Sequence, residues 1–270
     1  MSSITLSAGV RQNLLSLQST ADLFNVTQNR LATGKKVNSA LDNPVNFFTA
    51  QGLSNRAGDL SGLLDSMSNA INTIKAADAG ISAITKLVRS AQSIISQART
   101  NTDATVATDL EAQYDDIIAQ IDFLALDSGF NGINLLDGAT LTVNLNEDAS
   151  STIDIVGADE NTANDLGISG STYFTVAANL DAADTELTDA LTVLRTDSKS
   201  FGSSLSTVQI RQDFTKAMIT TLQVGADALT LADTNEEGAN MLALQTRQQL
   251  SITALSLASQ SNQAVLRLFA

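Results

Sequence analysis

Acidic clusters are the residues of this chain whose types and spacing come closest to chemistry, because its 270 residues include no His and no Cys. The commonest general base, the thiol nucleophile and the soft metal ligands are therefore missing. One cluster, Asp159-Glu160-Asn161 with Asp165, offers oxygen ligands of the kind that calcium binds. It lacks the spacing and the glycine of an EF-hand loop, so we interpret it as a solvated loop.

Two other acidic clusters are better explained by helix structure. One follows the expected start of a long helix near residue 181, where carboxylates favour the helix N-terminus. The other lies on the outer face of a helix near residue 115 and is typical of a solvated surface. The residues are Asp181, Asp184, Glu186 and Asp189 in the first, and Asp109, Glu111, Asp115, Asp116 and Asp122 in the second. We therefore predict no enzyme and no catalytic, cofactor-binding or metal-binding residue, and we expect the chemistry to be association.

The composition narrows the possible partners. A formal net charge of −14 disfavours binding to nucleic acid or to anionic membranes. The first residues lack a basic segment followed by a continuous apolar run, so no secretory signal is predicted. If the protein leaves the cell, it needs a route other than general secretion.

The end of the chain has the composition of a helix that is covered with protein. No charged residue occurs from Gln248 to Leu266, and apolar residues recur there at alternating spacings of four and three. Ten residues in this stretch are Gln, Asn, Ser or Thr, which is too polar for membrane insertion.

The start of the chain has the same character, with Arg11 and Asp22 as its only charges before Asn29. We predict that the two terminal helices pair in antiparallel fashion. Burial of their apolar side chains falls short of the entropy cost of ordering them, so copies of the chain must cover them. The predicted self-assembly residues are Val10, Leu14, Leu17, Ala21, Phe24, Leu31, Leu250, Ala254, Leu257, Ala264 and Leu268.

Two long seams between the ends predict a coiled-coil core. Each alternates steps of four and three over several heptads, with alanines that allow close approach of the helices. The seam residues are Leu63, Met67, Ile74, Ile81, Ile84, Val88 and Ile95 in the first, and Leu187, Leu191, Leu194, Phe201, Leu205 and Val208 in the second. Between the seams, Leu141, Val143 and Leu145 alternate with polar residues before Ile153 and Ile155, which predicts a β-hairpin.

The expected fold is mainly α: a long antiparallel coiled-coil bundle with a small central β-hairpin region and paired terminal helices. We place the halves of an inner helical domain at 1–34 and 226–270, and a connector at 35–57. The coiled-coil core occupies 58–225, with its β and turn region at about 129–178. Within the connector, Lys35–Gln51 is expected to be irregular. Gly225 and 233–238 are expected to interrupt the helices before the last one.

Three stretches resemble bacterial flagellins. They are NRLATGKKVNSA at 29–40 followed by Asp42-Asn43, SGFNGINLLD at 128–137, and the region from Asn240-Met241 to Val265-Leu266. The matches lie near both ends and in the middle, so the chain resembles a short flagellin without large outer domains.

Hook–filament junction proteins share the same order of elements, in which a terminal helix and a long coiled-coil helix stand on each side of a central region. They diverge from flagellins in the connector and the final helix. An intracellular coiled-coil adaptor remains a further alternative, although such proteins usually carry more Glu–Lys pairs.

The resemblance implies a structural subunit that is secreted and polymerises into the extracellular flagellar filament. It implies export through the flagellar apparatus, a secretion chaperone on the C-terminal helix, and contacts with hook-associated and cap proteins. In many flagellins an innate immune receptor recognises a patch on the long helices. Arg89 matches that patch, whereas Gln113 and Ser93 depart from it, so the resemblance does not extend to recognition by the receptor.

Overall fold

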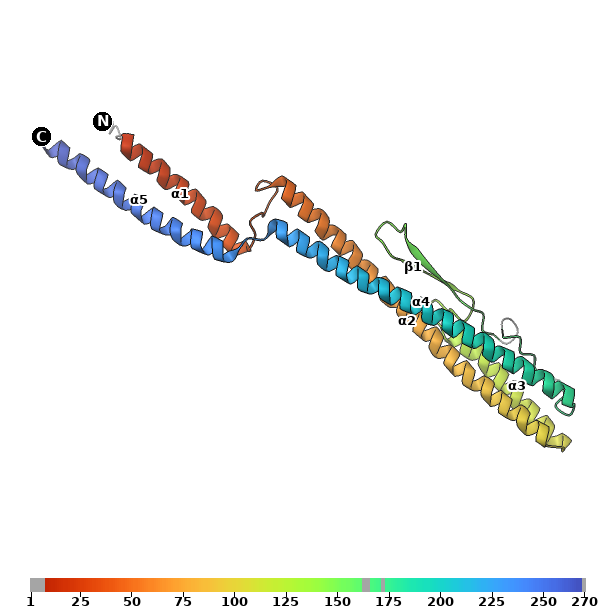
Figure 1. The fold of residues 1–270 in the computed structure, drawn as a ribbon. Coiled ribbons are helices and arrows are strands. Elements are labelled where there is room, and N and C mark those ends of the chain that lie inside the picture. The colour runs from red at the N-terminus through yellow and green to blue at the C-terminus, as the bar shows by residue number, and fades with distance from the viewer. Residues whose placement is uncertain (1–7, 162–165, 171–172, 269–270) are drawn as a thin grey trace. The chain divides into compact units, whose positions relative to one another are not determined.

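The computed structural model describes residues 8–161, 166–170 and 173–268. Within these ranges the chain forms long helices and one antiparallel hairpin, which confirms the expected, mainly α fold class (Figure 1). In chain order the elements are α1 (Ala8–Thr33), α2 (Pro44–Thr100), α3 (Ala104–Asp127), β1 (Thr140–Asn144), β2 (Thr152–Val156), α4 (Ala177–Thr230) and α5 (Thr234–Leu268).

The chain divides into two compact units. Unit 1 comprises Met1–Asn55 and Thr221–Ala270, so it is built from the two ends of the chain. Unit 2 is the continuous segment Arg56–Thr220. The helices α2 and α4 each contribute residues to both units.

The core of unit 2 lies along the two predicted seams, where α2 and α4 run side by side and α3 packs against them (Figure 1). Eleven of the thirteen seam residues are buried, and the other two, Leu63 and Leu205, are partly buried and pack against the same core. Ala77 and Ala91 are completely buried on the α2 seam, where a small side chain allows neighbouring helices to approach.

Two glycines of unit 2 lie where no side chain fits. A Cβ atom on Gly80 would lie 2.6 Å from Cδ1 of Leu136, and one on Gly157 would lie 2.6 Å from the backbone oxygen of Leu135. Gly157 meets backbone atoms, which cannot move aside as a flexible side chain can. The segment after β2 therefore packs directly on the turn that follows α3.

The hairpin has one face on the core and one in solvent, as its alternation predicts. In its register Leu141 pairs with Ile155 and Val143 pairs with Ile153. Leu141, Val143 and Ile155 are buried, whereas on the opposite face the Thr142 hydroxyl donates to the Asp154 carboxylate at 2.7 Å.

The connector is shorter than predicted, because α2 already begins at Pro44. Asn43 caps this helix: its side-chain oxygen accepts a hydrogen bond from the backbone N–H of Asn46 at 3.1 Å. Proline suits the first helical position because it has no N–H to leave unsatisfied. The irregular segment expected over Lys35–Gln51 therefore ends at Asn43, and this part of the prediction was wrong.

The breaks around the last two helices also differ from the prediction. Helix α4 begins at Ala177, ahead of Asp181, and continues through Gly225 to Thr230. Helix α5 begins at Thr234 because the Asp233 carboxylate accepts hydrogen bonds from the N–H groups of Asn235 and Glu236, at 2.8 and 3.3 Å. A cap thus starts the helix in a stretch that looked like a loop.

Hydrogen bonds join the connector to the junction between α4 and α5 within unit 1. The Lys36 N–H donates to Thr230 O at 2.8 Å, and the Ala232 N–H donates to Gly34 O at 3.0 Å. Gly34 has φ +69°, a left-handed conformation that ends α1. The two connecting segments of unit 1 therefore stabilise each other.

The turn before α2 is organised by one carboxylate. The backbone N–H groups of Asn38 and Ser39 both donate to Asp42 at 2.9 Å. These hydrogen bonds, of which the one from Asn38 contributes most, hold the pKa of Asp42 below its usual value.

None of the helices in the described range combines the length and hydropathy needed to cross a membrane.

Candidate assembly surface

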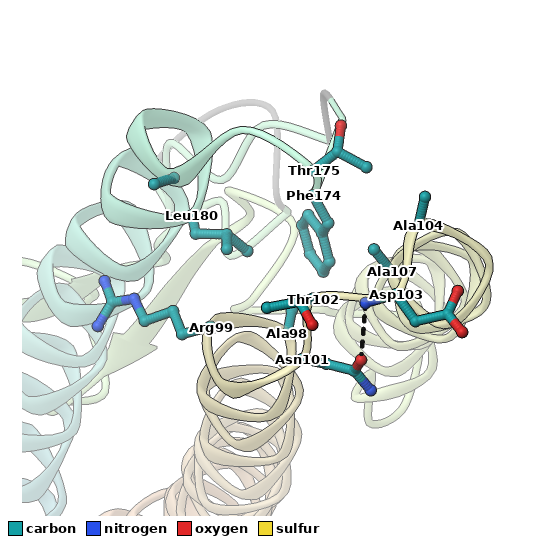
Figure 2. Close-up of a pocket in the computed structure, with 11 residues that line it drawn as sticks. Ala98, Arg99, Asn101, Thr102, Asp103, Ala104, Ala107, Phe174, Thr175 and Leu180 are labelled. Atoms are coloured by element: carbon teal, nitrogen blue, oxygen red, sulfur yellow. Dashed lines mark hydrogen bonds between the residues drawn. The ribbon is translucent and has the colours of Figure 1, made fainter.

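A pocket lined partly by charged residues lies at one end of the unit 2 bundle, and its polar groups serve the fold. Figure 2 shows Phe174 near the turn that joins α2 to α3, in a pocket of about 370 Å³. Arg99 forms ion pairs with Asp181 and Asp184 at 2.7 and 3.3 Å. Asp103 accepts a hydrogen bond from the Thr105 N–H at 2.9 Å and so caps α3. This pocket offers a ligand few groups that are not already bonded.

Several carboxylates of the acidic clusters have partners within the fold. Within the described ranges no group of three or more acidic residues is arranged to hold a metal ion. Asp181 and Asp184 bind Arg99, and Glu186 accepts from the Ser169 N–H at 2.8 Å. Glu160 is completely buried, so the interpretation of its segment as a solvated loop was wrong at that residue. Asp165 lies outside the described residues.

In unit 1, α1 lies beside α5 over most of its length (Figure 1). An ion pair fixes the pairing near the junction: Arg30 Nη1 lies 3.1 Å from Glu237 Oε1, and Glu237 is itself buried. On α5 the half-buried positions step by three and four: Met241, Leu244, Gln248, Ser251, Leu255 and Ala258. This row is the one that faces α1.

The predicted self-assembly residues divide into two groups. On α1, Val10 is buried and Leu17, Ala21 and Phe24 are half-buried, whereas Leu14 and Leu31 are 38% and 37% exposed. On α5 the row Leu250, Ala254, Leu257 and Ala264 is exposed, with Leu250 at 66% and Leu257 at 64% of full exposure. The side chain of Leu268 lies outside the described ones.

The sequence reasoning missed a second apolar row on α1. Leu15, Leu23 and Val26 are all exposed, Leu15 at 65%. They lie away from the row of α1 that faces α5. The sequence signal for them is that the apolar residues of this helix occupy a band wider than one partner helix can cover. On α5, Leu242 and Ile252 are exposed in the same way.

We define the terminal apolar surface as these exposed residues of α1 and α5: Leu15, Leu23, Val26, Leu242, Leu250, Ile252, Ala254, Leu257 and Ala264. Large apolar side chains that a helix pair leaves exposed in such number are typical of surfaces where protein binds protein. Few charges interrupt it, and none does between Gln248 and Leu266. The fold and this surface are typical of a structural protein that associates with other protein chains.

Comparison with known proteins identifies the family. The model of the bacterial flagellin N-terminal helical region matches residues 6–140, and that of the C-terminal helical region matches residues 180–269. The flagellins FljO and FljM of Caulobacter vibrioides are 30% and 31% identical to this chain, over 100% of it and 99% of each of them. A flagellin of Brucella melitensis is 28% identical over the same shares. The chain belongs to the bacterial flagellins, the structural subunits of the extracellular flagellar filament.

Proposed function

We propose that copies of this flagellin polymerise through the terminal apolar surface, which is buried only when several copies pack together. The observation that carries the proposal is the exposure of Leu250 and Leu257 on a helix that is already paired with α1. Burying one such side chain contributes roughly 1.5–3 kcal/mol. Repeated for each copy, this contribution favours the polymer over the single chain.

We assign the two units different tasks. Unit 1, with the expected inner-domain halves 1–34 and 226–270, supplies the contacts between copies. Unit 2, which covers most of the expected core at 58–225, folds by itself around the two seams. This division is supported by where the large apolar side chains lie, since most of those in unit 2 are buried in its core, whereas the terminal helices leave many of theirs exposed.

The same surface also suggests which other proteins the chain binds, both before export and in the assembled filament. We propose that a secretion chaperone covers α5 until the flagellar export apparatus takes the chain, because an exposed apolar helix otherwise promotes aggregation. Hook-associated and cap proteins would contact the subunits at the two ends of the filament. The protein would act without catalysis. Full-length similarity to flagellins gives no support to the junction-protein and adaptor alternatives.

Substitution of Leu257 tests the proposal. Leu257→Asp should leave the fold and melting of the single chain unchanged, because the side chain is largely in solvent there. In the polymer the carboxylate would be buried without a partner at a cost of several kcal/mol, so filaments should be absent. Leu257→Met is the matched control and should assemble, because it keeps an apolar side chain of similar size.

Circular dichroism measures the helix content and melting of the single chains of both variants. Electron microscopy of the assembly reactions shows whether each variant forms filaments. Abundant filaments from the Leu257→Asp chain would show that α5 does not carry the contact. A loss of helical signal in the unassembled Leu257→Asp chain would show that the residue serves the fold.

A further inference from the structure

A cluster of positive charge lies in an open groove of unit 2, well away in sequence from the terminal apolar surface. The groove, of about 470 Å³, runs between α2 and α4 over the buried side chains of Ile81 and Leu194. Its rim carries Lys86 and Arg89 from α2 and Arg195 and Lys199 from α4. All four cationic side chains belong to exposed residues. We refer to this feature as the cationic groove.

No acidic residue in the part of the chain that the structure describes forms an ion pair with the cations of the groove. Among the described residues, none of the four forms an ion pair within 4.0 Å, and no acidic residue lines the groove. Asp78 lies beside it, where its carboxylate accepts a hydrogen bond from the Ser198 hydroxyl at 3.1 Å. The whole chain has only 15 Lys and Arg against 29 Asp and Glu. Four unpaired cations in one groove are therefore a concentration of charge opposite to that of the rest of the molecule.

The occupant that best matches this charge is another copy of the chain. Each copy carries a net charge of −14, so neighbouring copies repel one another wherever their acidic surfaces meet. A groove that is positive and unpaired is a place where one copy can attract another. Matching of opposite charges across an interface also fixes its register.

The acidic face of α3 supplies a suitable counterpart. Asp109 and Asp116 are exposed and lie seven residues apart, two turns along one side of the helix, or roughly 10 Å. Farther along the same helix Phe123 is exposed at 58%, and Leu126 equally so. An acidic stripe that continues into exposed apolar side chains is the composition of a protein interface with a charged rim.

We propose that the cationic groove of one copy binds the acidic face of α3, with Asp109 and Asp116, in a neighbouring copy. No α3 residue contributes to the described lining of the groove, so the two surfaces are different parts of unit 2. A contact between different surfaces is heterologous, and such contacts build open helical polymers when they do not close into a ring. The inference rests on the proposed polymerisation and adds a second, electrostatic contact to the apolar one.

Charge reversal tests the groove. The variant Arg89→Glu with Arg195→Glu should raise the critical concentration for filament growth about tenfold or more at low salt, because attraction becomes repulsion. Its single chain should melt like the parent, since both residues are exposed. Lys75→Glu with Arg211→Glu is the matched control, because it reverses two exposed cations outside the groove. It changes net charge equally and should assemble far better than the groove variant.

Rescue identifies the occupant. Asp109→Lys with Asp116→Lys should impair growth as the groove variant does. Combining all four substitutions in one chain should restore growth, since every copy then carries both reversed surfaces. At about 1 M salt, where the screening length falls to about 3 Å, the defects should largely disappear.

Each other outcome overturns the inference. Growth of the groove variant equal to the parent would show that the groove is not a contact. A defect that the four-fold variant does not rescue, or that persists at high salt, would show that α3 is not the electrostatic partner. If the parent chain itself forms no filaments under these conditions, it is the proposed function that fails.

Discussion

Tyr114 shows how a single residue ties the stability of unit 2 to pH. Its ring packs edge-to-face on Phe174 with the ring centres 5.3 Å apart, and the residue is completely buried. Its hydroxyl has no hydrogen-bond partner among the described residues. Burial first, and then the nearby charges of Glu186 and Asp115, raise the pKa of Tyr114 well above its usual value of 10.0.

The raised pKa of Tyr114 predicts a loss of stability in alkali. The unfolded chain releases the phenol proton near pH 10, while the folded chain retains it, so the free energy of unfolding falls as pH rises above 10. The slope is about 1.4 kcal/mol per pH unit. Tyr114→Phe should remove this dependence, and near pH 8 it should be at least as stable as the parent because it buries no unpaired hydroxyl. Urea unfolding between pH 8 and 11 measures both chains, and parallel curves would contradict the assignment.

Residue-level prediction from sequence succeeded where a pattern repeats and failed where a position depends on distant contacts. The seam residues recur at helical spacing, so each one supports the next. Glu160 stands alone in a polar stretch, and nothing local indicates that the segment folds back so that its N–H donates to Leu136 O at 2.9 Å. The cationic groove joins residues from two helices more than a hundred positions apart, and this pairing emerges only from the fold.

At the scale of elements, the periodicity of apolar residues was enough to find the helices and the hairpin. The ends of the helices depended on single hydrogen-bonding side chains. Asn43 and Asp233 both extended a helix into a segment that resembled a loop. Gly225 was expected to interrupt the helix. Leu222 and Ala226, which flank it along α4, are buried, and this packing offsets the loss of about 1 kcal/mol in helix stability that a glycine causes.

The long α2 and α4 helices give the next prediction. Ile84→Asp places a carboxylate at a completely buried position on α2, whereas Ile210→Asp makes the same change at an exposed position on α4. The first should destabilise unit 2 by about 3–5 kcal/mol or more, and the second by little. For a unit of this size that corresponds to a fall in Tm of about 10 °C or more for Ile84→Asp. Thermal melting of the two single chains distinguishes them, and equal melting temperatures would contradict the assignment of the core.

At the scale of the whole molecule, the two units should differ in resistance to proteases. Unit 1 is a long helix pair with exposed apolar residues on both partners, whereas unit 2 has a continuous core. Trypsin should therefore cut the single chain first at Arg11, Arg30 and Arg247 and leave a fragment of residues 31–247, which contains the whole of unit 2. Mass spectrometry of timed digests gives the order of cuts. Assembled filaments are the control and should protect the ends, and equal protection of both units in single chains would contradict the division.

The construction of unit 1 from both ends of the chain also determines when the chain becomes able to polymerise. Its two halves are separated by the 165 residues of unit 2, counted from 56 to 220. Synthesis proceeds from the N-terminus, so α1 exists long before α5, and unit 2 can fold in the meantime. Once α2 and α4 are paired, only the short segments 34–43 and 231–233 remain to be ordered before α1 meets α5. A product that stops before residue 234 lacks α5, the partner of α1, and under the proposed contact it would therefore not join the growing polymer.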